Sequence, residues 1–275
     1  MKQELRKAFN GPSVCLVIVS ELLLMTTNIG YMDPSSGKTY TVLELLFQIN
    51  TQGNVPMEEL NWIVLWSEGF GAWVSIFIPM ILSVCYLRVL STERQNGNLR
   101  FVLMRTGIKK YCMQKTLCAA VTGGCLLLAG SILYGLLLMI SFPVPVTELG
   151  TYGYTVGTLA FYMVGRMFGI FFYGAMLNAF CLLVSIFLED RYLLICLPMM
   201  RKYIYSVVVT KIESNVIEMQ NELLLERVEK FRLETILDFS FTKEYLAMTG
   251  IICFTYVVCW RVFAWMMKKR RDCGA

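Results

Sequence analysis

Long apolar runs alternate with short charged stretches along the whole chain. A helix of about 20 apolar residues is needed to cross a bilayer core of about 30 Å. Runs of that length therefore predict membrane-spanning helices. We expect six of them, at residues 12–31, 64–90, 116–142, 156–187, 193–210 and 245–267. The pattern predicts an all-α membrane protein built as a single transmembrane domain over residues 1–275.

The fifth run is the weakest, because Pro198, Arg201 and Lys202 interrupt it. A discontinuous helix whose charges face the bundle interior would explain this composition. The alternative is a re-entrant or interfacial segment, which would place the chain ends on opposite sides of the membrane. Residues 211–243 then carry an apolar stripe between mixed charges, which predicts an amphipathic helical segment at the outer mouth of the bundle. The alternative there is a solvated helix packed by one face.

Lysine and arginine are concentrated before residue 12, within residues 91–115 and after residue 267. By contrast, the loops at residues 32–61 and 141–155 carry only Lys38. Cytoplasmic loops of membrane proteins are enriched in basic residues, so we expect both termini in the cytoplasm and residues 211–243 outside. No cleavable signal peptide is evident, and the first run is expected to be retained as a span.

Composition supports the membrane class and argues against an enzyme. Of 275 residues, 56% are hydrophobic and 16% are charged, whereas soluble domains carry about 25% charged residues. The ten cysteines form no CxxC pair, and the absence of histidine excludes His-based triads and most zinc sites. We expect no catalytic residue, no metal site and no cofactor in this chain.

The string Ser36-Gly37-Lys38-Thr39 is similar to the end of a phosphate-binding loop. Such a loop needs a glycine at the position that Met32 occupies, so we expect no nucleotide site here. ATP hydrolysis would have to come from another polypeptide. The basic residues lie at membrane boundaries, which argues against binding of nucleic acid.

Five charged residues fall within or beside the apolar runs and are candidates for a pathway or for contacts between helices: Glu21, Glu68, Arg166, Arg201 and Lys202. A charge inside a membrane is costly and should face protein or water. Two explanations stay open for Glu21, namely a substrate-pathway contact or a protonated or hydrogen-bonded packing residue. Arg166 is expected to snorkel or to pair with an acid such as Glu21 or Glu68.

Small residues in the third run predict close helix packing. Glycines at positions where helices meet let the two backbones approach each other. The expected contact positions are Gly123, Gly124, Gly130 and Gly135.

The stretch at residues 91–115 joins the second and third runs and is strongly basic. Leu99, Leu103 and Thr106 recur at helical spacing, so one face can be apolar while the other is cationic. Such a helix suits a membrane interface or the groove of a partner protein. The alternative is a solvated loop that only fixes the topology.

The chain resembles the ABC-2 type permeases of bacterial ATP-binding-cassette exporters, and most closely the small permease-like membrane proteins of Gram-positive bacteria. The residues that carry the resemblance are Glu93-Arg94, Gly97, Leu99, Leu103, Arg105-Thr106, Lys109-Lys110-Tyr111 and Lys115 before an apolar helix. The segment at residues 187–192 is similar to the turn between the family's fourth and fifth spans. The first outer loop and the Arg201-Lys202 pair have no counterpart.

The resemblance implies a permease subunit in a bacterial plasma membrane, with a second permease subunit and a separate ATPase subunit that holds ATP and Mg. In that family the loop between spans two and three is a coupling helix that docks into the ATPase. The residues that correspond here are Glu93, Arg94, Gly97, Leu99, Arg100, Leu103 and Arg105. The other hypothesis is a non-transporting accessory, immunity or sensing protein. The substrate cannot be identified from the sequence.

Overall fold

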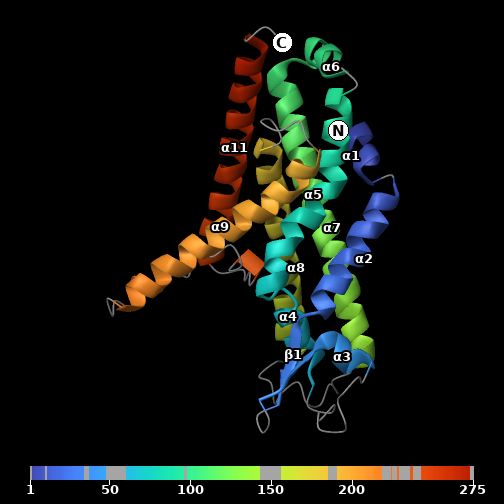
Figure 1. Cartoon of the computed structure of the whole chain (residues 1–275), viewed down its shortest axis with the longest axis vertical. Helices are drawn as coiled ribbons and strands as arrows, with labels where there is room; N and C mark the ends of the chain where they lie inside the picture. The colour runs from blue at the N-terminus through green and yellow to red at the C-terminus, as the bar shows by residue number, and fades with distance from the viewer. Residues whose placement is uncertain are drawn as a thin grey trace.

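The computed structural model is a bundle of helices with a short β-hairpin at one end (Figure 1). It describes residues 2–9, 11–33, 37–47, 60–95, 98–142, 156–184, 191–218, 224, 228, 236–237 and 243–272. The elements are α1 (Lys2–Phe9), α2 (Pro12–Thr26), β1 (Ile29–Met32), β2 (Thr39–Thr41), α3 (Val42–Phe47), α4 (Trp62–Glu68), α5 (Ala72–Gln95), α6 (Asn98–Thr106), α7 (Ile108–Ser141), α8 (Val156–Val184), α9 (Arg191–Glu218) and α11 (Lys243–Asp272).

Two described helices, α7 and α8, are long and apolar enough to cross a membrane, and α4 with α5 would make a third if the bent pair is one span. The prediction of a helical chain with membrane-spanning segments is confirmed at this level. Helix α2 is apolar but has only 15 residues. Helices α9 and α11 do not meet the same test of length and composition. The six-span arrangement therefore stays a prediction.

The predicted second span is broken near its start. Helix α4 ends at Glu68, α5 begins at Ala72, and the two axes meet at 68°. The bend lies at Gly69 to Gly71, whereas Pro79 lies inside α5. Glycine suits this bend because a Cβ at Gly71 would lie 2.5 Å from Asn28 Oδ1. The interruption therefore follows from glycine and close packing rather than from proline.

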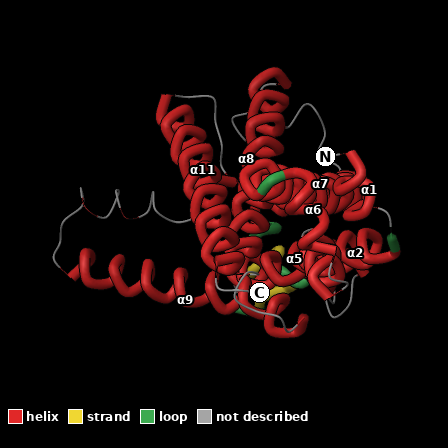
Figure 2. Tube along the Cα trace, turned by 90° about the horizontal axis from the view of Figure 1, so that it is seen from above, coloured by secondary structure: helices red, strands yellow, loops and turns green. Residues whose placement is uncertain are grey.

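Helix α9 is continuous through Pro198, so the interruption expected in the fifth run is absent. It also extends past residue 210 to Glu218, into the segment predicted as a separate outer helix. In both views α9 runs obliquely away from the bundle (Figures 1 and 2). Most of the predicted outer segment lies outside the described residues, although Ile236 and Leu237 are buried in the core.

The first apolar run ends earlier as a helix than the sequence predicted, and a hairpin follows it. The first run leaves the helix at Thr26, and residues 29–32 pair with residues 39–41 as an antiparallel hairpin. Gly37 supplies the left-handed backbone of its turn, at φ 67°. Lys38 and Thr39 lead into strand β2 and not into the helix that a phosphate-binding loop requires.

Helices α7 and α8 cross where both present glycine. A Cβ at Gly123 would lie 2.6 Å from the carbonyl oxygen of Gly174, and one at Gly174 would lie 2.7 Å from that of Gly123. A Cβ at Gly124 would lie 2.7 Å from the Phe171 carbonyl. Gly130 and Gly135 also pack closely, against Glu21 and Trp66. The predicted role of these glycines in close helix approach is confirmed.

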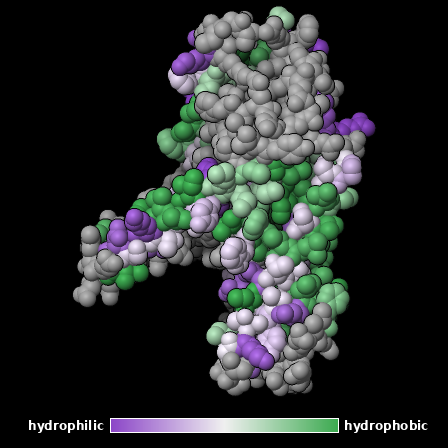
Figure 3. Space-filling view, in the orientation of Figure 1, coloured by the Kyte–Doolittle hydropathy of each residue, from purple (hydrophilic) through white to green (hydrophobic). Residues whose placement is uncertain are grey.

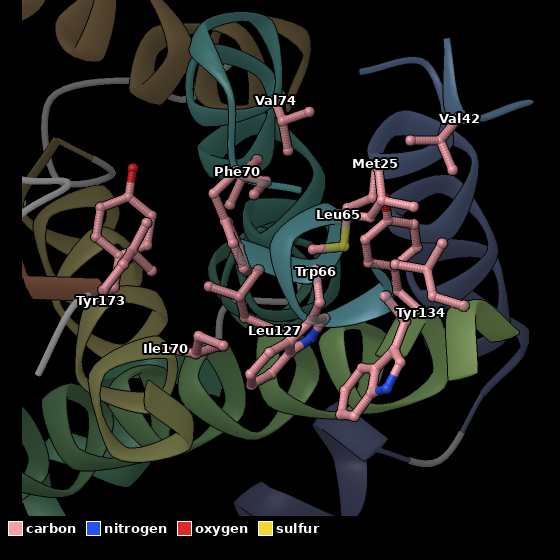
Figure 4. Packing of buried hydrophobic residues seen from close by; sticks show 14 of the residues in the cluster. Met25, Val42, Leu65, Trp66, Phe70, Val74, Leu127, Tyr134, Ile170 and Tyr173 are labelled. Carbon is pink, nitrogen blue, oxygen red and sulfur yellow. The ribbon is translucent and has the colours of Figure 1, made fainter. Parts of the chain in front are cut away.

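The interior has two apolar layers. The larger one joins α2, α4, α5, α7 and α8 around residues such as Met25, Trp66 and Tyr134 (Figure 4). The smaller one lies near the end of the bundle that holds α6 and the chain termini, and includes Tyr86, Tyr111 and Phe263.

The face of the bundle drawn in Figure 3 is apolar in its middle part. Many exposed side chains of α9 are apolar, whereas Lys202 and Glu213 of the same helix are buried. The exposed large apolar residues described on α9 are Met200, Tyr203, Ile204, Val207, Val208, Ile212 and Ile217. Thr210, Lys211 and Ser214 are exposed on the same helix. Exposed apolar side chains in this number are compatible with a protein whose sides face lipid.

Candidate functional site

The structure offers two separate candidate sites: a buried polar group at the bend between α4 and α5, and the exposed end of the bundle around α6. The first is built around Arg166 of α8, whose side chain is 3% exposed. Its guanidinium donates hydrogen bonds to the Ser67 carbonyl and, at 3.2 Å, to the Tyr162 hydroxyl. It also lies 5.5 Å from the ring centroid of Trp66.

The break in the helix explains why a cation sits there. A helix that ends leaves its last carbonyls without intrahelical partners and carries partial negative charge. The Ser67 carbonyl accepts from Arg166, and the Glu68 carbonyl accepts from the amide of Asn28. Arg166 and Asn28 thus satisfy the carbonyl end of α4, which would be costly to leave unpaired in an apolar environment.

The other end of α4 is also held firmly. Asn61 caps the helix through a hydrogen bond from Ile63 N to its Oδ1 atom at 2.8 Å. The indole of Trp66 donates to the backbone carbonyl and the hydroxyl oxygen of Ser131 on α7, each at 3.1 Å. Helix α4 is therefore capped at its start by Asn61 and anchored to α7 through Trp66 and to α8 through Arg166.

Arg166 and Glu21 do not meet through hydrogen bonds. Glu21 is fully buried on α2, and within the described residues neither of its carboxyl oxygens has a hydrogen-bond partner. Arg166 reaches the backbone beside Glu68, while the Glu68 side chain is exposed. The charged candidates of the sequence thus do not gather at one point.

The two remaining candidates lie on α9. Lys202 is 1% exposed, and its Nζ atom lies 5.9 Å from the ring centroid of Tyr173 on α8. Arg201, next to it, is half-buried. Lys202 faces inward, as expected for a charge in an apolar run.

The second candidate site is α6 with the ends of α5 and α7. Gly107, at φ 75°, turns the chain from α6 into α7, and its N–H donates to the Leu103 carbonyl at 2.9 Å. Val102, Met104 and Arg105 are exposed, with Met104 73% exposed. Leu103 instead packs against the smaller apolar layer, together with Leu5 of α1 and Trp260 of α11.

The described part of the chain shows only some of the predicted coupling residues. Glu93, Arg94, Leu99 and Arg100 belong to helices α5 and α6, but their side chains lie outside the described set, as does all of Gly97. Arg105 is exposed as a docking residue would be. Leu103 is turned toward the protein's own core. Met104, which the sequence analysis did not single out, is the most exposed apolar residue among the described side chains of this helix, those of residues 102–106.

Sequence reasoning also missed a buried amide at the α7–α8 crossing. Asn178 donates from Nδ2 to the Ala119 carbonyl at 2.8 Å and lies 3.4 Å from the Thr122 hydroxyl. A single asparagine in an apolar run gives no periodic signal, although amides in spans often bond across helices. Lys115, one of the basic residues before the third run, is likewise buried, at 2% exposed.

Among the described residues, no cluster of acidic or cysteine side chains could hold a metal ion. The chain matches no protein-family model, and searches of curated proteins and of solved structures also found no match. The two sites must therefore be interpreted from their own geometry.

Proposed function

We propose that this chain is the transmembrane permease subunit of an ATP-binding-cassette exporter in a bacterial plasma membrane. It has six spans with both termini in the cytoplasm, and it pairs with a second permease subunit that is either a copy or a relative. A separate ATPase subunit binds ATP and Mg and docks on α6. The observation that carries the proposal is the short, exposed helix α6, which connects the ends of α5 and α7.

The charges at this end of the bundle support a cytoplasmic location. Helix α6 lies at the same end as the N- and C-termini, and the β-hairpin lies at the opposite end (Figure 1). Among the described side chains, the exposed basic residues of the α6 end are Arg6, Lys7, Arg105, Lys109, Lys110, Lys268 and Lys269. An excess of basic residues on one side marks the cytoplasmic face.

The residues that pack beneath α6 would transmit a movement of α6 to α7 and α11. Leu103 and Ile108 pack against the layer that contains Tyr111, Phe263 and Met267, which joins α7 to α11. The indole of Trp260 also donates to the Lys109 carbonyl at 3.3 Å. Close-packed layers move as units, so a partner that tilts α6 would move α7 and α11 with it.

The test is copurification with a candidate ATPase subunit, the first candidate being any ATP-binding-cassette ATPase encoded beside this chain. Docking through α6 predicts that the double variant Met104→Ala with Arg105→Glu weakens the complex at least about tenfold, which corresponds to about 1.4 kcal/mol. The matched control is Lys38→Glu, the same charge reversal on an exposed residue of the opposite end. It should bind as the wild type does.

Undiminished binding of the α6 variant would contradict docking at this helix. In vesicles that contain both subunits, the proposal also requires ATP-driven flux that is lost in the same variant. A chain that binds the ATPase but is dispensable for flux would be an accessory protein.

A further inference from the structure

The side chain of Glu21 is buried in the contact between α2 and α7 under conditions that suit only a neutral carboxyl group. It is 0% exposed, and neither carboxyl oxygen has a hydrogen-bond partner in the described part of the chain. A carboxylate in apolar surroundings without a partner costs far more than a neutral acid does. We infer that Glu21 is a proton-binding site and that α2 packs on α7 only while Glu21 holds its proton.

Helix α7 approaches the Glu21 side chain directly at Gly130. A Cβ at Gly130 would lie 3.2 Å from Glu21 Cβ and Cδ and would overlap its Oε2 atom. No space for a methyl group remains between the Gly130 backbone and the carboxyl group, so α7 itself covers this side of the carboxyl group.

Among the described side chains, the stretches of α7 around Gly130 and of α5 at residues 72–86 supply no positive charge to balance an ionised Glu21. The helices that pack against α2 are α7 and α5. The titratable groups nearest to Gly130 along α7 are Cys125 and Tyr134, and the α5 stretch at residues 72–86 offers Cys85 and Tyr86. None of these groups becomes cationic.

The described cations that do exist lie elsewhere. Lys115 is on α7 but 15 positions before Gly130, about 22 Å along the helix axis. Arg166 is engaged at Ser67 and Tyr162. One turn beyond Glu21, the α2 contact is apolar, with Met25 in the same cluster as Leu65 and Tyr134 (Figure 4). An ionised Glu21 could therefore reach water only if α2 moved away from α7.

The inference does not rest on the transport proposal, because it follows from packing at α2 and α7 alone. The experiment compares the full chain with Glu21→Gln, which mimics the neutral acid, by thermal unfolding in lipid nanodiscs from about pH 5 to about pH 9. The unfolded chain releases the Glu21 proton at neutral pH, whereas the folded chain keeps it. The wild-type midpoint should therefore fall, relative to Glu21→Gln, as the pH rises.

The control is Glu68→Gln, which neutralises an exposed acid on α4 and should keep the pH dependence of the wild type. Infrared spectra give an independent measure, because a protonated carboxyl has its own carbonyl band. That band should be present in the wild type at neutral pH and missing from Glu21→Gln. If Glu21→Gln fails to fold, Glu21→Leu, which keeps the site neutral, takes its place in both measurements.

Parallel unfolding curves for the wild type and the neutral variant across the pH range would overturn the inference. So would a wild-type spectrum at neutral pH without a carbonyl band that depends on Glu21. Failure of both neutral variants to fold would overturn it as well, because a site that holds a neutral acid tolerates a neutral replacement. None of these results bears on docking at α6.

Discussion

At the scale of single residues, Arg166 shows how a buried cation can supply a hydrogen-bond donor where a helix is interrupted. The helix stops between α4 and α5, and the guanidinium donates to a carbonyl at the end of α4 while it lies over the Trp66 ring. Hydrogen bonds from a charged donor in an apolar interior are stronger than those at a surface. Arg166 thus ties α8 to α4 through its hydrogen bond to the Ser67 carbonyl and its contact with the Trp66 ring.

We predict that Arg166→Ala lowers the free energy of unfolding by about 1.5–3 kcal/mol, since it removes a charged donor from a buried acceptor. Arg166→Lys should recover only part of this loss, because an ammonium group lacks the planar fork that reaches Ser67 and Tyr162 together. The measurement is unfolding in detergent, with Arg261→Ala as the matched control. Arg261 is exposed beside Trp260, and its loss should change stability by less than about 0.5 kcal/mol. Equal effects at the two arginines would contradict the role given to Arg166.

At the scale of elements, the fold is organised by the crossing of α7 with α8. Its glycines bring two backbones into contact, and Asn178 adds a hydrogen bond across the same crossing. In lipid there is little hydrophobic force between helices, so such close contacts stabilise the bundle. Loss of this crossing would disturb both helices that are long and apolar enough to span the membrane.

Gly123→Ala should destabilise the protein by about 1–3 kcal/mol, because its Cβ would press on the backbone of α8, which cannot give way cheaply. Gly250→Ala is the matched control, since a Cβ at Gly250 meets nothing within 4 Å. That substitution should be neutral or stabilising by up to about 1 kcal/mol, as expected for alanine in a helix. The midpoint of thermal unfolding of each variant distinguishes the two cases, and a Gly123→Ala chain as stable as the control would show that the crossing is not tight.

Hydropathy predicted α7 and α8, the two described helices that are long and apolar enough to cross a membrane, and composition predicted the packing glycines. Both depend on local sequence. The sequence did not predict the features of the fold that depend on tertiary contacts. The bend at Gly69–Gly71 depends on the approach of Asn28, and the uninterrupted course of α9 past Pro198 cannot be inferred from the residues of that helix alone. Two of the candidate charges have separate neighbours, since Lys202 lies beside Tyr173 and Arg166 donates to the Ser67 carbonyl. Periodicity also could not show that Leu103 faces inward while Met104 faces out.

At the scale of the whole molecule, the arrangement has two unlike ends. The α6 end is basic and carries exposed Met104, whereas the opposite end carries the β-hairpin with Lys38 (Figure 1). Between them, the face drawn in Figure 3 is apolar in its middle part. The proposal requires the first end to face the cytoplasm, where an ATPase subunit can reach α6, and the hairpin to face outward.

The most direct test of this account is labelling with a membrane-impermeant thiol reagent in intact bacterial cells. Single variants Met104→Cys and Lys38→Cys are compared with the unmodified chain, which corrects for reaction of the exposed native cysteines Cys15, Cys196 and Cys253. The account predicts that Lys38→Cys reacts in intact cells, whereas Met104→Cys reacts only after the membrane is permeabilised. Labelling of Met104→Cys in intact cells would place α6 outside and contradict the account.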